Sequence, residues 1–323
     1  MKLRIATLQL NPIIGQVEEN IKRALTILDE SLKPPFPDII LLPELAITGY
    51  NFANPQQVAP YLEEQGKGKT YDLGNFISTK YNCHTVLGYP EKKDSLIYNS
   101  AYCISPTGSI IHNYRKSFLY KTDEDWGCSE SPSGFTNFNV TIQNRVFKTA
   151  IGICMDLNPY KFTAPFEKYE FANYCYSNEV ELVLVPTAWM NHAWKDDWKQ
   201  EDVDHYTKLY EPEEPFEYNI DLKEKNILIL TQYTPPTYTR SYPDSETAVY
   251  WILRFAPFHA NKFTKPKVVA ICNRSGIEGR AMYAGSSSIY RYNGRAFPEL
   301  IDVNVFGSLG QGNEGILVRD VDV

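Results

Sequence analysis

The sequence has little of several features that mark specialised classes of protein. It holds six cysteines in 323 residues and no CxxC pair, whereas a disulfide framework or structural zinc site needs cysteines at a denser, more regular spacing. No apolar run approaches the roughly 18 residues that a membrane helix needs. Lys plus Arg number 32 against 39 Asp plus Glu, a net charge of −7, so a broad nucleic-acid-binding face is not expected. Neither nucleic acid nor membrane is therefore predicted as a partner.

The composition that remains is that of a globular protein. Hydrophobic residues make up 43% and charged residues 22%, and the length suffices for one large domain or two ordinary ones. The opening MKLRIATLQL alternates polar and apolar residues, which is typical of a strand and unlike the continuous apolar core of a signal peptide. We therefore expect a reducing compartment, with the cytoplasm as the default and the nucleus or mitochondria left open. A cysteine is then expected to be free or catalytic.

Hydrophobic periodicity predicts alternating strands and helices, the rhythm of an α/β sandwich. The run 38–43 is continuously apolar after its first residue, as in a strand buried on both faces. Strands are expected at 3–10, 38–43, 84–89, 98–105, 109–114, 148–154, 180–186, 267–272 and 287–292, with helices at 17–32, 71–80, 165–177 and 250–258.

An acidic segment interrupts this rhythm. Residues 196–224 carry eleven acidic side chains against three lysines and no arginine, a local net charge of −8, while the remainder of the chain sums to +1. Such a segment is usually a solvated face. We expect an insertion or long loop, with regular structure resuming at 226–230.

Three local patterns could carry chemistry. Glu44 follows the buried strand in LLPELAITGY, where α/β sheets place their sites and where an apolar setting suits a general base, although a Glu there is often only a helix cap. Lys116 lies among aromatics in NYRKSFLY and could stabilise an oxyanion, although such a lysine is more often on the surface. Cys154 ends a predicted strand in AIGICMD, although a lone buried cysteine is usually inert packing. Each pattern alone is weak.

Together these motifs resemble the Glu-Lys-Cys triad of the nitrilase (carbon–nitrogen hydrolase) superfamily. The order matches, and so do the separations of 72 and 38 residues. VPTAW at 185–189, AICNRSG at 270–276, GSSSIY at 285–290 and EGIL at 314–317 resemble further strands of that family. The resemblance implies an α/β fold, a four-layer α-β-β-α sandwich in a single domain over 1–323, with the acidic insertion at about 191–248.

One branch of the superfamily is especially similar, the fungal enzymes that deamidate the N-termini of proteins. QLNPIIGQV, GICMDLNPYKF, YWILRF and YAGSS carry this resemblance. It implies release of ammonia from N-terminal Asn and Gln, giving Asp and Glu, in the N-degron route to ubiquitin-dependent degradation. Protein or peptide substrates with those N-termini are thus the expected partners, and the oligomeric state is not legible.

The resemblance also implies residue roles. Cys154 would be the nucleophile that forms a thioester, Glu44 the general base and then acid, and Lys116 the oxyanion stabiliser, assisted by the backbone N–H of Met155. Glu130 resembles the second glutamate of many relatives, with Glu124 as its rival.

No metal or organic cofactor is implied. The five histidines lie too far apart in sequence for a helix-borne metal pair. A Cys-His nucleophile pair stays open at this point, although nothing in the sequence favours it.

Selectivity for a chain terminus needs a carboxylate that binds the substrate α-ammonium. The candidates left open are Asp123, Glu124, Asp125, Asp156 and the acidic insertion, and Asp156 more often would hold local backbone. Trp189 is expected beside the substrate, in the strand that closes the pocket. Two alternatives remain: an ω-amidase or carbamoylase acting on free metabolites, and a catalytically silent scaffold that binds a partner.

Overall fold

The computed structural model describes residues 1–208, 238, 241–294 and 303–323. The helices are α1 (Val17–Ser31), α2 (Pro55–Val58), α3 (Lys69–Tyr81), α4 (Lys121–Asp125), α5 (Glu170–Ser177), α6 (Gln200–Lys208), α8 (Ser245–Arg254) and α9 (Ala256–Ala260). The strands are β1 (Lys2–Gln9), β2 (Ile39–Leu41), β3 (His84–Lys93), β4 (Leu96–Ile104), β5 (Ile110–Arg115), β6 (Asn137–Ile142), β7 (Arg145–Ile151), β8 (Leu182–Thr187), β9 (Lys267–Asn273), β10 (Ile277–Glu278), β11 (Ala281–Met282), β12 (Ser288–Tyr292), β13 (Val303–Ser308) and β14 (Gly315–Asp322).

Two six-stranded mixed sheets form the centre of the molecule. Their strand orders are β14-β1-β2-β3-β4-β5 and β13-β12-β9-β8-β7-β6. Each sheet has three parallel strands in its middle, β1-β2-β3 and β7-β8-β9, with antiparallel strands on either side. Parallel strands need apolar cover on both faces, which explains the continuously apolar run that contains β2.

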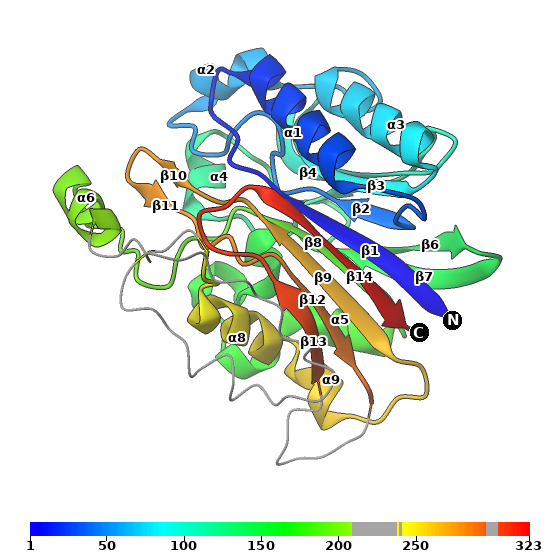
Figure 1. Ribbon diagram of the computed structural model, residues 1–323. Helices are drawn as coiled ribbons and strands as arrows, with labels where there is room; N and C mark the ends of the chain where they lie inside the picture. Colours follow the sequence, from blue (N-terminus) through cyan, green and yellow to red (C-terminus); the bar gives the residue numbers. More distant parts are fainter. Residues whose placement is uncertain (209–237, 239–240, 295–302) are drawn as a thin grey trace.

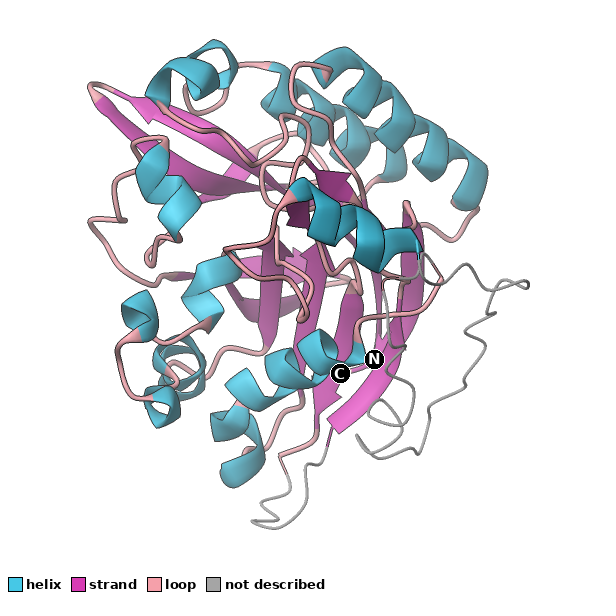
Figure 2. Ribbon diagram, turned by 90° about the vertical axis from the view of Figure 1, so that its left-hand side faces the viewer, coloured by secondary structure: helices cyan, strands magenta, loops and turns pink. Residues whose placement is uncertain are grey.

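The two sheets pack face to face with helices outside them (Figure 1). Side chains between the sheets, such as Ile5, Leu41, Leu184 and Ala270, form one buried cluster. A second cluster joins α1 and α3 to the first sheet, and a third joins α5, α8 and α9 to the second. Figure 2 shows these helices on opposite sides of the strands. The predicted four-layer α-β-β-α sandwich is confirmed.

Most predicted elements are present, with informative differences at their ends. The strand expected at 148–154 ends at Ile151, and Cys154 begins a 3₁₀ turn, η2 (Cys154–Leu157). The helix expected at 250–258 is two helices, because Pro257 in the first turn of α9 has no N–H with which to continue α8. The edge strand β6 was not predicted, although its apolar residues alternate with Asn137, Asn139 and Thr141 as in a half-buried strand.

The predicted insertion at about 191–248 is partly described. Residues 191–208 include α6, and residues 241–248 lead into α8, whose N-cap Asp244 accepts from the Thr247 N–H at 3.2 Å. The regular structure expected to resume at 226–230 lies outside the described residues, so the extent of the insertion stays a prediction. In the part of the chain that is described, no helix has the length and apolar character needed to cross a membrane.

Candidate active site

The three triad candidates follow strand ends at one edge of the two sheets. Glu44 lies three residues after β2, Lys116 directly follows β5, and Cys154 lies three residues after β7. β2 and β7 belong to the parallel trios, and the carboxyl ends of such strands are where α/β sheets present their sites. Residues 72 and 38 positions apart thus converge because the sheets bring their strand ends together.

The backbone around Glu44 fits closely against β3. Gly88 of β3 has no space for a side chain, because a Cβ there would lie 2.8 Å from the Glu44 Cα. The next residue, Leu45, has a φ of +45°, a left-handed conformation that costs about 1–2 kcal/mol for a residue other than glycine. Tight packing against Gly88 thus fixes the carboxylate at the cost of local strain.

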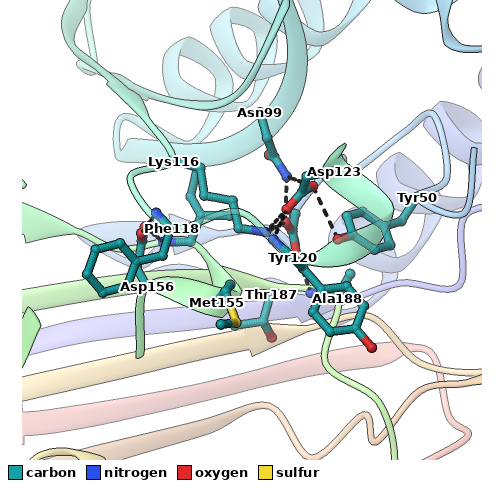
Figure 3. Close-up of polar contacts among 12 residues, drawn as sticks. Tyr50, Asn99, Lys116, Phe118, Tyr120, Asp123, Met155, Asp156, Thr187 and Ala188 are labelled. Atoms are coloured by element: carbon teal, nitrogen blue, oxygen red, sulfur yellow. Dashed lines mark hydrogen bonds and ion pairs between the residues drawn. The ribbon is translucent and has the colours of Figure 1, made fainter. Parts of the chain in front are cut away.

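A buried charge network surrounds the Lys116 ammonium (Figure 3). Its Nζ donates to Glu44 Oε1 at 2.7 Å and to Asp123 Oδ2 at 2.6 Å, and all three side chains are fully buried. Asn99 Nδ2 donates to Glu44 Oε1 at 2.6 Å and to Asp123 Oδ1 at 2.9 Å. Tyr50 donates to Asp123 Oδ1 at 3.2 Å. Such bonds compensate much of the cost of burying these charges.

The charges in this network favour a protonated lysine and a basic carboxylate. Burial alone would lower the pKa of Lys116, but the charges of Asp123 and Glu44 outweigh it and raise that pKa well above its usual value. Burial raises the pKa of Glu44, the charge of Lys116 opposes this shift, and the like charge of Asp123 adds to it. Glu44 is therefore a better proton acceptor than an ordinary glutamate.

Cys154 occupies a strained turn at the edge of a cavity. Its φ is +43°, its exposure is 8%, and it lines a cavity of about 400 Å³. Burial, followed by the charge of Glu44, raises the pKa of the Cys154 thiol well above its usual value, while Lys116 opposes the shift. The resting side chain is thus a thiol that needs a base, and the carboxylate whose charge it senses most strongly is Glu44.

Asp156 anchors the loops that carry Cys154 and Lys116. Its Oδ2 accepts from the Ile153 N–H and the Tyr114 hydroxyl at 2.8 Å each, and its Oδ1 accepts from the N–H groups of Ser117 at 3.1 Å and Phe118 at 2.8 Å. Burial raises the pKa of Asp156 to about 6, against these hydrogen bonds, which lower it. The expectation that it holds local backbone agrees with these contacts.

The residues directly after β8 form another wall of the cavity that Cys154 lines, and hydrogen bonds hold them in place. The Ala188 N–H donates to Glu44 Oε2 at 2.8 Å, and the Trp189 N–H donates to Asn273 Oδ1 at 2.7 Å. Trp189 is half-buried, and with Met155 it lines the cavity beside Cys154. Both residues therefore share a cavity with Cys154, and their expected roles toward the substrate stay predictions.

The outer end of the cavity carries a carboxylate. Glu246, in the first turn of α8, lines it together with His192 and Thr247. His192 Nδ1 lies 2.7 Å from Asp244 Oδ1, and His192 Nε2 lies 3.8 Å from Glu246 Oε1. Burial would lower the pKa of His192, but its hydrogen bond to Asp244 and the charges of Asp244 and Glu246 together outweigh burial and raise that pKa. In the described residues, no hydrogen bond joins a histidine to Cys154.

The second carboxylate on the lysine differs from the expected one. Within the described structure, Asp123 rather than Glu130 or Glu124 accompanies Glu44 at Lys116 Nζ. Glu130 is exposed and accepts from the Tyr160 hydroxyl at 2.9 Å. Glu124 is 52% exposed and lies 3.7 Å from Lys161. The sequence did not single out Asp123, because a buried Asp in DED looks no different from its exposed neighbours. The role of Glu130 as the second glutamate stays a prediction.

Other members of the site carried no sequence signal. Asn99 faces the network from β4, and Glu246 looks like an ordinary acidic residue in the first turn of a helix. Among the residues described, no group of three His, Cys, Asp or Glu side chains has the arrangement of a metal site.

The fold and this triad define a hydrolase of carbon–nitrogen bonds. Residues 4–201 match the carbon–nitrogen hydrolase family, and the chain belongs to that family. Over 99% of its length it is 32% identical to a protein N-terminal amidase of Saccharomyces cerevisiae, of which it covers 95%. The family resemblance inferred from the motifs is confirmed.

Solved structures of N-terminal amidase are similar along the whole chain. One, with an Asn-Glu peptide, has a TM-score of 0.83 at 30% identity, covering 99% of this chain and 97% of that one. Another, with a Gln-Gly peptide, has a TM-score of 0.82 at the same identity and coverage. The likeness therefore includes the region beyond residue 201.

Proposed function

We propose that this protein is an N-terminal amidase that hydrolyses the side-chain carboxamide of N-terminal Asn and Gln, releasing ammonia and leaving Asp and Glu. The observation that carries the proposal is the Lys116 ammonium held between two buried carboxylates, whose charges act on Cys154 in the lining of a cavity. The similarity to protein N-terminal amidases, and to N-terminal amidase structures with Asn-Glu and Gln-Gly peptides, supports this substrate class. The N-degron pathway belongs to the same proposal.

The chemistry follows from the charges. Glu44 takes the thiol proton as the Cys154 sulfur attacks the carboxamide carbon, and the carbonyl oxygen gains negative charge. Lys116 and the backbone N–H of Met155 stabilise that oxyanion, and such a donor is typically worth about 3 kcal/mol. Glu44 then gives its proton to the leaving nitrogen. The carbon–nitrogen bond of the tetrahedral intermediate breaks, ammonia departs, and a thioester remains on Cys154.

Hydrolysis of the thioester completes the cycle. Glu44 takes a proton from water, hydroxide adds to the thioester carbon, and the carbon–sulfur bond breaks to give the carboxylic acid and the thiol. Asp123 contacts the lysine, and its hydrogen bonds to Lys116 and Asn99 give it a positioning role.

Selectivity for a chain terminus rests on the outer end of the cavity. Glu246 supplies a negative charge on the wall formed by α8, in the cavity that Cys154 also lines. An α-ammonium group, three bonds from the reacting carbon in Asn and four in Gln, is the substrate feature that such a carboxylate fits. A substrate without this cation would leave the carboxylate unpaired when it displaces water.

The test compares ammonia release from three substrates: an Asn-Gly peptide, its N-acetylated form and free glutamine. We expect the unblocked peptide to be preferred, and Glu246→Gln to raise its KM about tenfold, the loss of one charged contact. Glu30→Gln, on the exposed outer face of α1, is the matched control.

Two results would contradict the proposal. A greater rate on free glutamine or carbamoyl compounds would favour a metabolite amidase. No ammonia from any substrate would favour the partner-binding scaffold.

A further inference from the structure

A second, smaller cavity adjoins the catalytic one. It has a volume of about 200 Å³, and Tyr120, Met190 and Trp194 line both cavities. Its far side contains Trp198 and Arg280. The shared residues form the boundary between the two spaces, and Figure 3 shows Tyr120 beside Ala188 and the Lys116 network.

The aromatic side of the second cavity is held in place by hydrogen bonds. The indole Nε1 of Trp194 donates to the Arg280 carbonyl at 2.9 Å, and Arg280 Nη1 donates to the Trp198 carbonyl at 2.9 Å. The Asn191 N–H donates to the Met282 carbonyl at 2.8 Å. Residues 190–198 are therefore fastened to the β10–β11 hairpin, and a preorganised surface binds with a smaller loss of conformational entropy.

The Tyr120 hydroxyl is close enough to residues of both cavities for their charges to act on it. Burial, followed by the charges of Asp196 and Cys154, raises the pKa of Tyr120 to about 12. Asp196 lines the second cavity and Cys154 the first. The Tyr120 side chain therefore interacts with a residue of each cavity, as expected for a residue at their boundary.

An N-terminal residue has two groups to place besides its reacting side chain, and the catalytic cavity offers one place for each. Its Cα carries an ammonium and a peptide carbonyl besides the reacting side chain. Glu246 lines only the first cavity, on α8, whereas the boundary with the second cavity lies at Tyr120 and Trp194. With the ammonium directed to Glu246, the peptide carbonyl has the other exit.

We propose that the second cavity is the subsite for the second residue of the substrate polypeptide, and that Trp194 and Trp198 select an apolar side chain there. This inference rests on the proposed function. Two acidic and two basic side chains line the subsite, so their charges balance: Asp125, Asp196, Lys121 and Arg280. Apolar contact with the two tryptophans therefore decides which side chain the subsite prefers.

The test measures kcat/KM for ammonia release from Asn-Leu-Ser and Asn-Gly-Ser amides. We expect wild-type protein to prefer the leucine peptide about tenfold, the effect of half-burying one leucine side chain. Trp198→Ala should reduce that ratio to about twofold, through KM rather than kcat, because the contact exists before and during the reaction. A ratio within one preparation is independent of the folded fraction.

Phe76→Ala is the control, since Phe76 is an exposed aromatic on α3, and it should leave the ratio unchanged. A wild-type ratio near one, or a preference that survives Trp198→Ala, would overturn the subsite. Absence of ammonia from both peptides with wild-type protein would instead remove the proposed function, and the subsite with it.

Discussion

The inner and outer ends of the catalytic cavity are built on different principles. At the inner end, the charges that act on Cys154 belong to Glu44, Lys116 and Asp123. These side chains are fully buried, and each makes two or more charged or hydrogen-bonded contacts. At the outer end, Glu246 is 61% exposed and His192 is 24% exposed. Glu44 and Lys116 follow strand ends of the sandwich and Asp123 lies on α4, whereas the outer groups lie on α8 and the segment after β8.

This difference separates reaction from selection. Buried charges interact strongly and leave little freedom for change, because removing one leaves another uncompensated. Half-exposed groups interact through water, and their contribution is smaller and easier to alter. The inner end therefore suits acyl transfer, and the outer end suits recognition of a particular substrate.

The largest effect should come from the nucleophile. Cys154→Ala removes the atom that forms the thioester, so ammonia release from an Asn-Gly peptide should fall by at least about 10⁴-fold. Cys175→Ala, a buried cysteine on α5, should retain near wild-type kcat. Appreciable activity in Cys154→Ala would exclude the thioester mechanism.

Asp123 should matter more than the exposed glutamates. Asp123→Asn weakens the hold on Lys116, and kcat should fall about 100-fold, as when a group that orients a catalytic residue is lost. Since the Asp123 charge raises the pKa of Glu44, its removal should shift the acid limb of the kcat/KM profile to lower pH. The profile against pH checks both.

Glu130→Gln and Glu124→Gln are the matched controls for Asp123. Both side chains are exposed, so kcat should change less than twofold. A larger loss in Glu130→Gln than in Asp123→Asn would return the second-carboxylate role to Glu130.

Asp156→Asn should act on stability as well as on activity. The amide has one acceptor oxygen for four donors, so two buried groups lose their partners at about 1 kcal/mol or more each. Urea denaturation should show a loss of about 2 kcal/mol in the free energy of unfolding. Asp94→Asn, at an exposed turn, should be near neutral, and equal stability of both variants would disprove the anchor.

The acidic surface should give the smallest effect. Neutralising four exposed aspartates should slow capture of cationic N-termini about twofold at low salt, with no difference at high salt, because exposed charges are screened. Values of kcat/KM measured against ionic strength test this prediction. The four aspartates are Asp196, Asp197, Asp202 and Asp204. Rates that do not change at any ionic strength would leave only a solvated face.

A parallel variant controls for net charge. Four exposed acids of α1 lie on the opposite outer layer, and neutralising them should leave the rate unchanged: Glu18, Glu19, Asp29 and Glu30. An equal slowing would indicate a global effect of charge.

Elements with strong apolar patterns were predictable, and the polar partners of the site were not. The buried run containing β2 and the helical spacing in α1 follow from local periodicity. Asn99 and Asp123 show no such pattern, because their importance comes from side chains that are distant in sequence. The break between α8 and α9 was missed although Pro257 signals it.

The sequence by itself determined the alternation of strands and helices, because apolar periodicity is a local property of the chain. Its motifs, through their family resemblance, indicated the sandwich and the three side chains that we propose react. Only the tertiary structure decided that Asp123 faces Lys116, that Glu246 reaches the cavity and that Trp198 lines a neighbouring one. The physical reason is that charge pairing and cavity shape depend on which strand ends and loops meet in space. Neighbouring acidic residues can therefore have opposite fates: Asp123 is buried at the centre of the site, whereas Glu124 remains at the surface.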